Sequence, residues 1–278
     1  MTAQTGTGIV DASINYQGEM EGRPAYYATD YSRDRLALVS EKVAIRDLRD
    51  RKGATSLEEE GFMLVDHRTA VRDFHNDDDV AKIYIPEVER LMLEITGAQR
   101  ILMNRRCVLR FSERSMEFGS RVNTRPARFV HVDFSSEALP MLLQPLLQAA
   151  GYNKPPGRRY IGFNVWRVIS PPPQDIPLSV CDMRSVDLKD MVEADAIFDA
   201  PGQPEWGFEG YLFHPNPKHR WGYFSNMTPD EALIFKSFDS EAQPLQCVPH
   251  VAFSDPNCPP DAAPRASVEA RGFAFFDD

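Results

Sequence analysis

The sequence predicts a mainly β protein with flanking helices, built as a sandwich or a barrel. Short runs of β-prone residues follow one another from about residue 101 onwards, and Pro-rich and Gly-rich turns separate them. A series of strands joined in this way is typical of these two architectures. A chain of 278 residues can bury a full core, and we predict a single domain over residues 1–278.

The first hundred residues have a different character. Short β-prone runs such as residues 8–10 alternate with polar, Gly and Pro residues, as in an edge or capping segment. Asn76 and the acidic residues 77–79 indicate a helix start. Residues 87–96 then place apolar side chains at i, i+3, i+4 and i+7, which predicts a helix with one apolar stripe: Val88, Leu91, Met92 and Ile95. We predict that residues 1–100 form an N-terminal capping and helical segment.

Residues 101–278 are predicted to form the β core. A Leu- and Gln-rich helix over residues 136–150 ends at Gly151. Residues 170–203 contain three consecutive prolines and are predicted to be an insertion that leaves the sheet. The predicted strands cover residues 101–103, 107–111, 128–134, 160–169, 210–213, 221–224, 232–238, 250–253 and 267–276.

Charge and composition exclude several partners. Asp plus Glu outnumber Lys plus Arg by 41 to 31, the net charge is −10, and no dense basic cluster is present, so we expect no nucleic acid partner. No apolar run approaches the roughly 20 residues of a membrane helix. The polar start, residues 1–4, lacks the layout of a signal peptide, so we expect a cytoplasmic protein without a membrane partner. No Cys-x-x-Cys pair is present, which predicts reduced thiols at Cys107, Cys181, Cys247 and Cys258.

The sequence His131-Val132-Asp133 is the strongest indication of function. Residues two apart on a strand point to the same side, so His131 and Asp133 can offer a nitrogen and an oxygen to one metal ion. His250 opens another predicted strand and is the best candidate for a third ligand. Two histidines and one carboxylate leave open positions on Fe(II). The remaining histidines are weaker candidates: His67, His75, His214 and His219.

A second pair of residues follows His250 in the sequence. Arg265 and Ser267 share one strand face, so a guanidinium and a hydroxyl can converge on a single carboxylate. Arg271 lies on the same face and is the alternative to Arg265 as the residue that binds this carboxylate. We favour Arg265 because Ser267 is two residues away.

These residues, in this order, resemble the Fe(II)/2-oxoglutarate-dependent oxygenases, whose fold is a distorted jelly roll, the double-stranded β-helix. Within that superfamily the chain is similar to a microbial branch described as gibberellin-desaturase-like or cephem-methoxylase-like. The resemblance covers roughly residues 60–276. It rests on His131-x-Asp133, Asn164-Val165-Trp166-Arg167, residues 177–182, His219-Arg220-Trp221-Gly222-Tyr223-Phe224, residues 227–232, Pro249-His250-Val251-Ala252-Phe253 and residues 265–271.

The resemblance implies a cofactor set and a reaction. His131, Asp133 and His250 would hold Fe(II), Arg265 and Ser267 would bind the far carboxylate of the cosubstrate 2-oxoglutarate, and O2 would take the remaining position. Decarboxylation to succinate and CO2 would then yield a ferryl oxidant that hydroxylates, desaturates or rearranges a small molecule, such as a secondary metabolite. The protein itself would position the substrate and exclude water.

A substrate pocket is harder to predict. Asn164, Trp166, Trp221 and Lys236 are the candidate substrate-binding residues, with Arg167 as a further polar candidate. Aromatic residues on strands are more often part of a core than of a pocket. With that reservation, three more could line it: Tyr223, Phe235 and Phe238.

Three other functions stay open at this level. Zn²⁺ suits the same ligands and would support hydrolysis, although Arg265 and Ser267 argue against it. An iron oxygenase could also act without 2-oxoglutarate, and a jelly-roll protein could bind a ligand without turnover. The sequence determines neither the substrate nor the oligomeric state.

Overall fold

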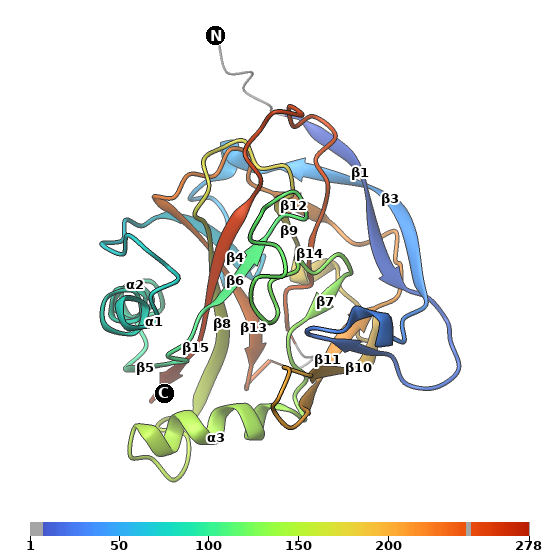
Figure 1. The fold of residues 1–278 in the computed structure, drawn as a ribbon. Coiled ribbons are helices and arrows are strands. Elements are labelled where there is room, and N and C mark those ends of the chain that lie inside the picture. The colour runs from blue at the N-terminus through green and yellow to red at the C-terminus, as the bar shows by residue number, and fades with distance from the viewer. Residues whose placement is uncertain (1–7, 243–245, 278) are drawn as a thin grey trace.

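The computed structural model describes residues 8–242 and 246–277, and its centre consists of two β sheets (Figure 1). Apolar side chains of both sheets pack together between them, among them Val180 from one sheet and Trp166 and Phe235 from the other. The first four residues of the chain, from which we predicted that there is no signal peptide, lie outside the described residues.

The larger sheet has nine strands, in the spatial order β1-β3-β12-β9-β14-β7-β11-β10-β2. Most neighbours are antiparallel, and β12 with β3 and β10 with β2 are the parallel pairs. In chain order the strands are β1 Ile9–Gln17, β2 Ala25–Tyr27, β3 Leu38–Asp47, β7 His131–Val132, β9 Leu178–Cys181, β10 Met191–Phe198, β11 Trp206–Phe213, β12 Trp221–Tyr223 and β14 His250–Ala252.

The smaller sheet has the order β4-β13-β8-β15-β5, and β6 also pairs with β15. Successive side chains of the long strand β15 point to opposite faces, so one set faces the larger sheet and the other set faces outwards. The strands are β4 Phe62–Asp66, β5 Arg100–Met103, β6 Val108–Phe111, β8 Arg159–Val168, β13 Glu231–Asp239 and β15 Ala266–Phe276.

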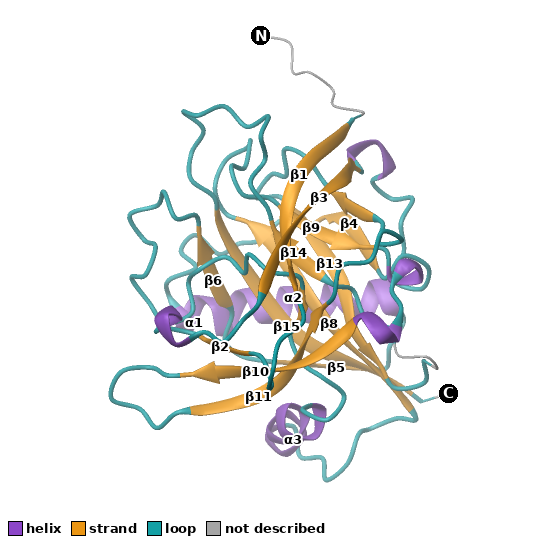
Figure 2. Ribbon diagram, turned by 90° about the vertical axis from the view of Figure 1, so that its right-hand side faces the viewer, coloured by secondary structure: helices purple, strands orange, loops and turns teal. Residues whose placement is uncertain are grey.

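Helices cover the outside of the smaller sheet and one end of the space between the sheets (Figure 2). Asn76 accepts hydrogen bonds from two backbone N–H groups and so caps α1, Asp77–Asp79, as the sequence predicts. A π-helical turn, Val80–Tyr84, leads into α2, Ile85–Thr96, which buries Val88 and Met92 and ends at Gly97 with φ +67°. Short 3-10 helices span Tyr31–Arg33, Arg49–Arg51, Met183–Ser185 and Leu188–Asp190.

Helix α3, Leu139–Ala149, confirms the helix predicted over residues 136–150. It packs Leu143 and Leu147 against Phe273 and Phe275 of β15. The helix thereby closes one end of the space between the sheets, while α2 lies on the opposite face of the smaller sheet.

The structure differs from the prediction at residues 170–203. They are not an insertion outside the sheet, because β9 lies inside the nine-stranded sheet between β12 and β14, and β10 pairs with β11 and β2. All four side chains of β9 are buried. A strand that is buried on both faces lacks the polar alternation by which a sequence pattern is recognised.

The predicted boundary near residue 101 is also wrong. Strands β1 and β3 form one side of the larger sheet, with β1 at its edge, and β4 is the edge of the smaller sheet. The partner of β3 is β12 and the partner of β4 is β13, and both come more than 150 residues later in the sequence. Such long-range pairing is set by the tertiary structure, so local patterns suggested a separate segment. A single domain over the whole chain stays a prediction.

No helix in the described ranges is long and apolar enough to cross a membrane.

Candidate metal centre

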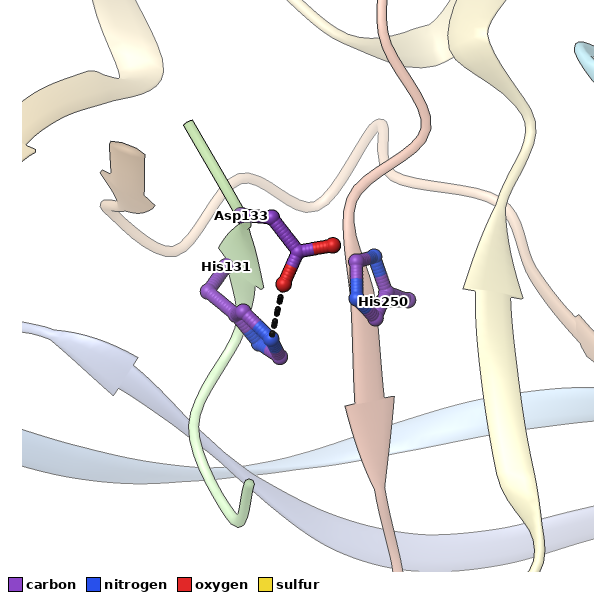
Figure 3. Close-up of side chains that lie close together, drawn as sticks. All are labelled: His131, Asp133 and His250. Atoms are coloured by element: carbon purple, nitrogen blue, oxygen red, sulfur yellow. Dashed lines mark ion pairs between the residues drawn. The ribbon is translucent and has the colours of Figure 1, made fainter. Parts of the chain in front are cut away.

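Two neighbouring strands of the larger sheet bring His131, Asp133 and His250 together. Strands β7 and β14 are antiparallel, and their register sets His131 directly opposite His250. Asp133 follows the last residue of β7 by one position. As predicted, it lies on the same side as His131, and the Nε2 atom of His131 is 3.9 Å from its Oδ1 (Figure 3). One possible ligand atom from each of the three residues lies within 4.8 Å of the others.

The orientation of both histidines suits metal binding. The Nδ1 atom of His131 is 3.0 Å from the carbonyl oxygen of Phe129, and Nδ1 of His250 is 3.1 Å from that of Val248. An Nδ1–H that donates to a carbonyl leaves the lone pair on Nε2 for a metal. Burial, with His250 nearby, lowers the pKa of His131 to about 3, and burial also lowers the pKa of His250. Both rings are therefore neutral near pH 7, as metal ligands must be.

Asp133 is held from the opposite sheet. Asn164 on β8 donates from Nδ2 to its Oδ2 at 2.6 Å, and Arg271 on β15 donates from NH2 to its Oδ1 at 2.7 Å. Burial alone would raise the pKa of a carboxyl group, but Arg271 and the two histidines outweigh it and hold the pKa of Asp133 well below its usual range. The aspartate is therefore ionised, and each carboxylate oxygen keeps a second lone pair for a metal.

Arg265 carries a buried guanidinium group with unused hydrogen-bond donors. The residue is 1% exposed, and its Nε and NH2 atoms have no hydrogen-bond partner among the described residues. Burial, with Arg128 nearby, lowers the pKa of Arg265 to about 9. A buried guanidinium is costly without a partner, so these N–H groups suit an anionic ligand.

The other residues of this region are already engaged. Arg271 is paired with both Asp133 and Glu269, which favours Arg265 over Arg271 as the residue free to bind a carboxylate. Ser267 is buried, and its hydroxyl lies 3.4 Å from the carbonyl oxygen of Arg110. The ring of Trp166 lies 5.8 Å from the Arg265 guanidinium.

A cavity opens beside two of the three candidate ligands, His131 and Asp133, and Arg271 also lines it. The rest of its wall includes aromatic residues of the N-terminal segment and of β10 and β11, and the loop before β7. This wall is not predicted by the sequence; it includes Tyr26, Tyr31, Arg110, Arg125, Phe198 and Phe208. The segments that form the wall lie far apart in the sequence, so no local pattern could group them.

Two of the predicted substrate-binding residues are not brought to this cavity. Trp221 donates its indole N–H to the hydroxyl of Tyr16, and Lys236 pairs with Asp239 at 3.1 Å. Both are buried, and neither is among the residues that line the cavity. Both faces of these strands are buried, so the sequence alone does not indicate which face meets the cavity.

The further candidates divide in the same way. Arg167 faces the helices, where its Nε donates to Tyr84 at 3.2 Å, so it is not a substrate residue of this cavity. Phe235 lies 4.7 Å from the ring of His250, whereas Phe238 stacks on Tyr160 and Tyr223 packs against Phe253. Asn164 and Trp166 lie beside Asp133 and Arg265, respectively.

The fold and the site define a two-sheet β protein with a candidate metal centre between its sheets. A solved structure described as the iron and alpha-ketoglutarate-dependent endoperoxidase NvfI has the same fold, with a TM-score of 0.78 over 97% of this chain and 99% of that chain, at 22% identity. The predicted distorted jelly roll is thereby confirmed.

Comparisons of sequence identify the family. The family model described as the Oxidoreductase/YMDC permease-like domain matches residues 14–275. The hydroxylase/desaturase efuI of Hormonema carpetanum is 30% identical over 100% of this chain and 99% of its own length. The alpha-ketoglutarate-dependent dioxygenase phiK of a fungal species (strain ATCC 74256) is 27% identical, with 97% of each chain covered.

The chain belongs to this family of oxidoreductases. A third relative is named as the Fe(II)/2-oxoglutarate-dependent dioxygenase nvfI of Aspergillus novofumigatus and is 28% identical over 84% of this chain and 83% of its own. These names confirm the resemblance to Fe(II)/2-oxoglutarate-dependent oxygenases, and they give no support to a zinc hydrolase or to a noncatalytic binding protein.

Proposed function

We propose that the chain is a non-haem Fe(II)- and 2-oxoglutarate-dependent oxygenase that hydroxylates, desaturates or rearranges a small molecule. The observation that carries this proposal is the group of two neutral histidines and one ionised aspartate, with their ligand atoms within 4.8 Å of one another. Two histidines and a carboxylate leave open positions on iron for a cosubstrate and O2. The relatives named as hydroxylase/desaturases and dioxygenases support the same reaction class.

Each residue has an assigned role in this proposal. His131, Asp133 and His250 hold Fe(II), and Arg265 binds the far carboxylate of 2-oxoglutarate, with Ser267 beside it. When bound, iron and 2-oxoglutarate supply the oxidising power, and the cosubstrate is converted to succinate and CO2. Asn164 and Arg271 fix the carboxylate of Asp133, and the carbonyls of Phe129 and Val248 fix the two imidazoles. Burial of all three ligands keeps water away from the reacting atoms.

Zinc deserves comparison because it accepts the same ligands. The unpaired guanidinium of Arg265 favours the oxygenase, since a hydrolase has no need of a buried carboxylate-binding arginine at this position. An oxygenase that does not use 2-oxoglutarate would likewise leave these N–H groups without a partner.

The test is an anaerobic titration of the protein with Fe(II) and then with 2-oxoglutarate. We expect the weak visible charge-transfer band of the chelated cosubstrate, and we expect it to be lost in His250→Ala. His214→Ala is the matched control, because His214 bonds to the carbonyl of Gln17 and lies outside the three-ligand group. Iron binding without the band would refute the cosubstrate assignment, and a failure to bind iron would refute the oxygenase.

The assignment of Arg265 has its own test. Arg265→Ala should raise the 2-oxoglutarate concentration that gives half of the band by at least about tenfold, because a charge-assisted bidentate contact is lost. The affinity for Fe(II) should stay unchanged. An unchanged 2-oxoglutarate requirement would assign the carboxylate to another residue.

A further inference from the structure

The wall of the cavity beside the candidate metal centre is unusually basic for this chain. Four arginines line it, Arg110, Arg125, Arg128 and Arg271, against two aspartates, Asp34 and Asp133. The chain as a whole carries a net charge of −10. The arginines are therefore concentrated here against the overall charge of the protein, which favours an anionic ligand in the cavity.

Two of these arginines already have acidic partners. Arg271 is paired with Asp133 and Glu269, and Arg128 donates two hydrogen bonds to Glu113, at 3.0 and 2.9 Å. Their charges are therefore largely neutralised within the protein. They do not account for an affinity for anions.

The other two arginines have no acidic partner within 4.0 Å among the described residues. NH1 of Arg110 donates to the backbone and side-chain oxygens of Asn123 and to the carbonyl of Arg125, so neutral oxygens hold it in place. The guanidinium of Arg125 lies 4.6 Å from the centre of the Tyr31 ring. Both side chains are half-buried at the cavity wall. Both guanidinium groups are thus held near the cavity without an acidic partner in the part of the chain that the structure describes.

The loop around Asn123 has a conformation that orients the guanidinium group of Arg110. Asn123 adopts a φ of +62°, a left-handed conformation that asparagine tolerates better than other non-glycine residues. This conformation brings both of its oxygens to NH1 of Arg110. The remaining acid on the wall, Asp34, accepts from the backbone N–H of Tyr27, and it forms no ion pair within 4.0 Å with Arg125 among the described residues.

The rest of the cavity wall is apolar and aromatic. The rings of Tyr26 and Phe129 lie 5.0 Å apart, and Phe198 and Phe208 face the same space from β10 and β11. Flat rings of this kind pack well against an aromatic or alicyclic body. The cavity thus combines a hydrophobic surface with two unpaired cations.

We propose that the cavity binds substrates that carry a carboxylate or phosphate group on an aromatic or alicyclic body, with Arg110 and Arg125 binding the anion. This inference rests on the proposed function, in which the substrate enters beside His131 and Asp133. The cosubstrate 2-oxoglutarate is also an anion, but its assigned residue, Arg265, is not among the described residues that line the cavity. Arg110 and Arg125 are therefore assigned to the substrate.

The test uses three probes with the same ring system: 2-naphthoate, 2-naphthyl phosphate and the neutral 2-naphthamide. Their dissociation constants are measured by ligand-observed NMR under anaerobic conditions, with and without Fe(II) and saturating 2-oxoglutarate. We expect at least one of the two anions to bind about tenfold more tightly than the amide, because a charge-assisted contact is gained. The tighter of the two identifies the preferred anion.

The variant Arg110→Gln/Arg125→Gln should remove this preference and leave the affinity for the amide unchanged. Arg72→Gln/Arg121→Gln is the control, since it makes the same change of charge at two exposed arginines that do not line the cavity. Anions that bind no better than the amide, or not at all, or a preference that survives in the double variant, would overturn the proposal.

A final measurement separates this inference from the proposed function. The double variant should keep the Fe(II)/2-oxoglutarate charge-transfer band at the wild-type cosubstrate concentration. Loss of the band in the double variant alone would assign the two arginines to 2-oxoglutarate and overturn the substrate proposal. Absence of the band in the wild-type protein would refute the cosubstrate assignment, while a preference for anions would still establish the cavity as an anion site.

Discussion

At the scale of single residues, the site depends on groups that do not themselves meet the metal. Asp133 stays ionised although it is buried, because Asn164 and Arg271 reach it from the opposite sheet. The histidines are oriented by two backbone carbonyls and need no further side chain. The aspartate is therefore the ligand whose position depends most on other side chains.

Asn164→Ala tests this dependence. The variant removes the hydrogen bond to Oδ2 of Asp133, and we expect the affinity for Fe(II) to fall by about tenfold, as is usual when a group that orients a ligand is lost. An anaerobic Fe(II) titration measures it. Asn216→Ala is the control, because Asn216 donates a bond of the same length, 2.6 Å, to Asp190 outside the site. Equal affinities in the two variants would show that Asn164 does not position the ligand.

At the scale of elements, the register of short strands assembles the ligands. Strand β7 has only the residues His131–Val132, yet it lies between β14 and β11 and is fixed on both sides. On one side His131 faces His250, and on the other Val132 faces Tyr211. A shift by one residue would turn His131 away from the site.

Gly210→Ala is predicted to disturb this arrangement. Gly210 is in β11, and a Cβ atom there would lie 2.9 Å from the carbonyl oxygen of Asp133 and 3.1 Å from that of Val132. These are backbone atoms, so the end of β7 must shift. We expect a loss of stability of about 1–3 kcal/mol and an Fe(II) affinity lower by about tenfold. Chemical denaturation and metal titration measure the two effects.

Gly207→Ala provides the control in the same strand. Its Cβ would lie 2.6 Å from the carbonyl oxygen of Ala196 in β10, which is a comparable clash away from the metal centre. This variant should lose stability and keep its affinity for Fe(II). If both variants lost metal affinity equally, a general loosening of β11 would be the cause.

At the scale of the whole molecule, the candidate metal centre links the two sheets. Its ligands come from β7 and β14 of the larger sheet, and Asn164 and Arg271, which hold Asp133, come from β8 and β15 of the smaller sheet. A metal bound here would favour the arrangement in which both sheets are in place. Binding should therefore stabilise the entire fold.

We expect Fe(II) at a hundred times its dissociation constant to stabilise the protein by about 2.7 kcal/mol. For a chain of this size, the increase corresponds to a rise in Tm of about 5 °C. Thermal unfolding under anaerobic conditions measures it, with His250→Ala as the variant that should show no shift. A similar shift in that variant would place the iron at another site.

The class of the fold and the core of the site follow from the sequence. Short β-prone runs separated by turns predicted a mainly β protein, and the structure brings the predicted ligands His131, Asp133 and His250 close together. Their role as metal ligands, and that of Arg265 as the carboxylate-binding residue, stay predictions. This succeeded because strand periodicity and residue chemistry are local properties. A cytoplasmic location stays a prediction.

Only the tertiary structure decided which strands meet and which faces enclose the cavity. The pairing of β3 with β12, the place of β9 inside the sheet, and the location of Trp221 and Lys236 away from the cavity all depend on contacts between distant segments. The same holds for Arg110 and Arg125, whose lack of acidic partners becomes visible only when the chain is folded. A sequence pattern records which side chains can be buried, whereas packing between the sheets determines what each buried side chain touches.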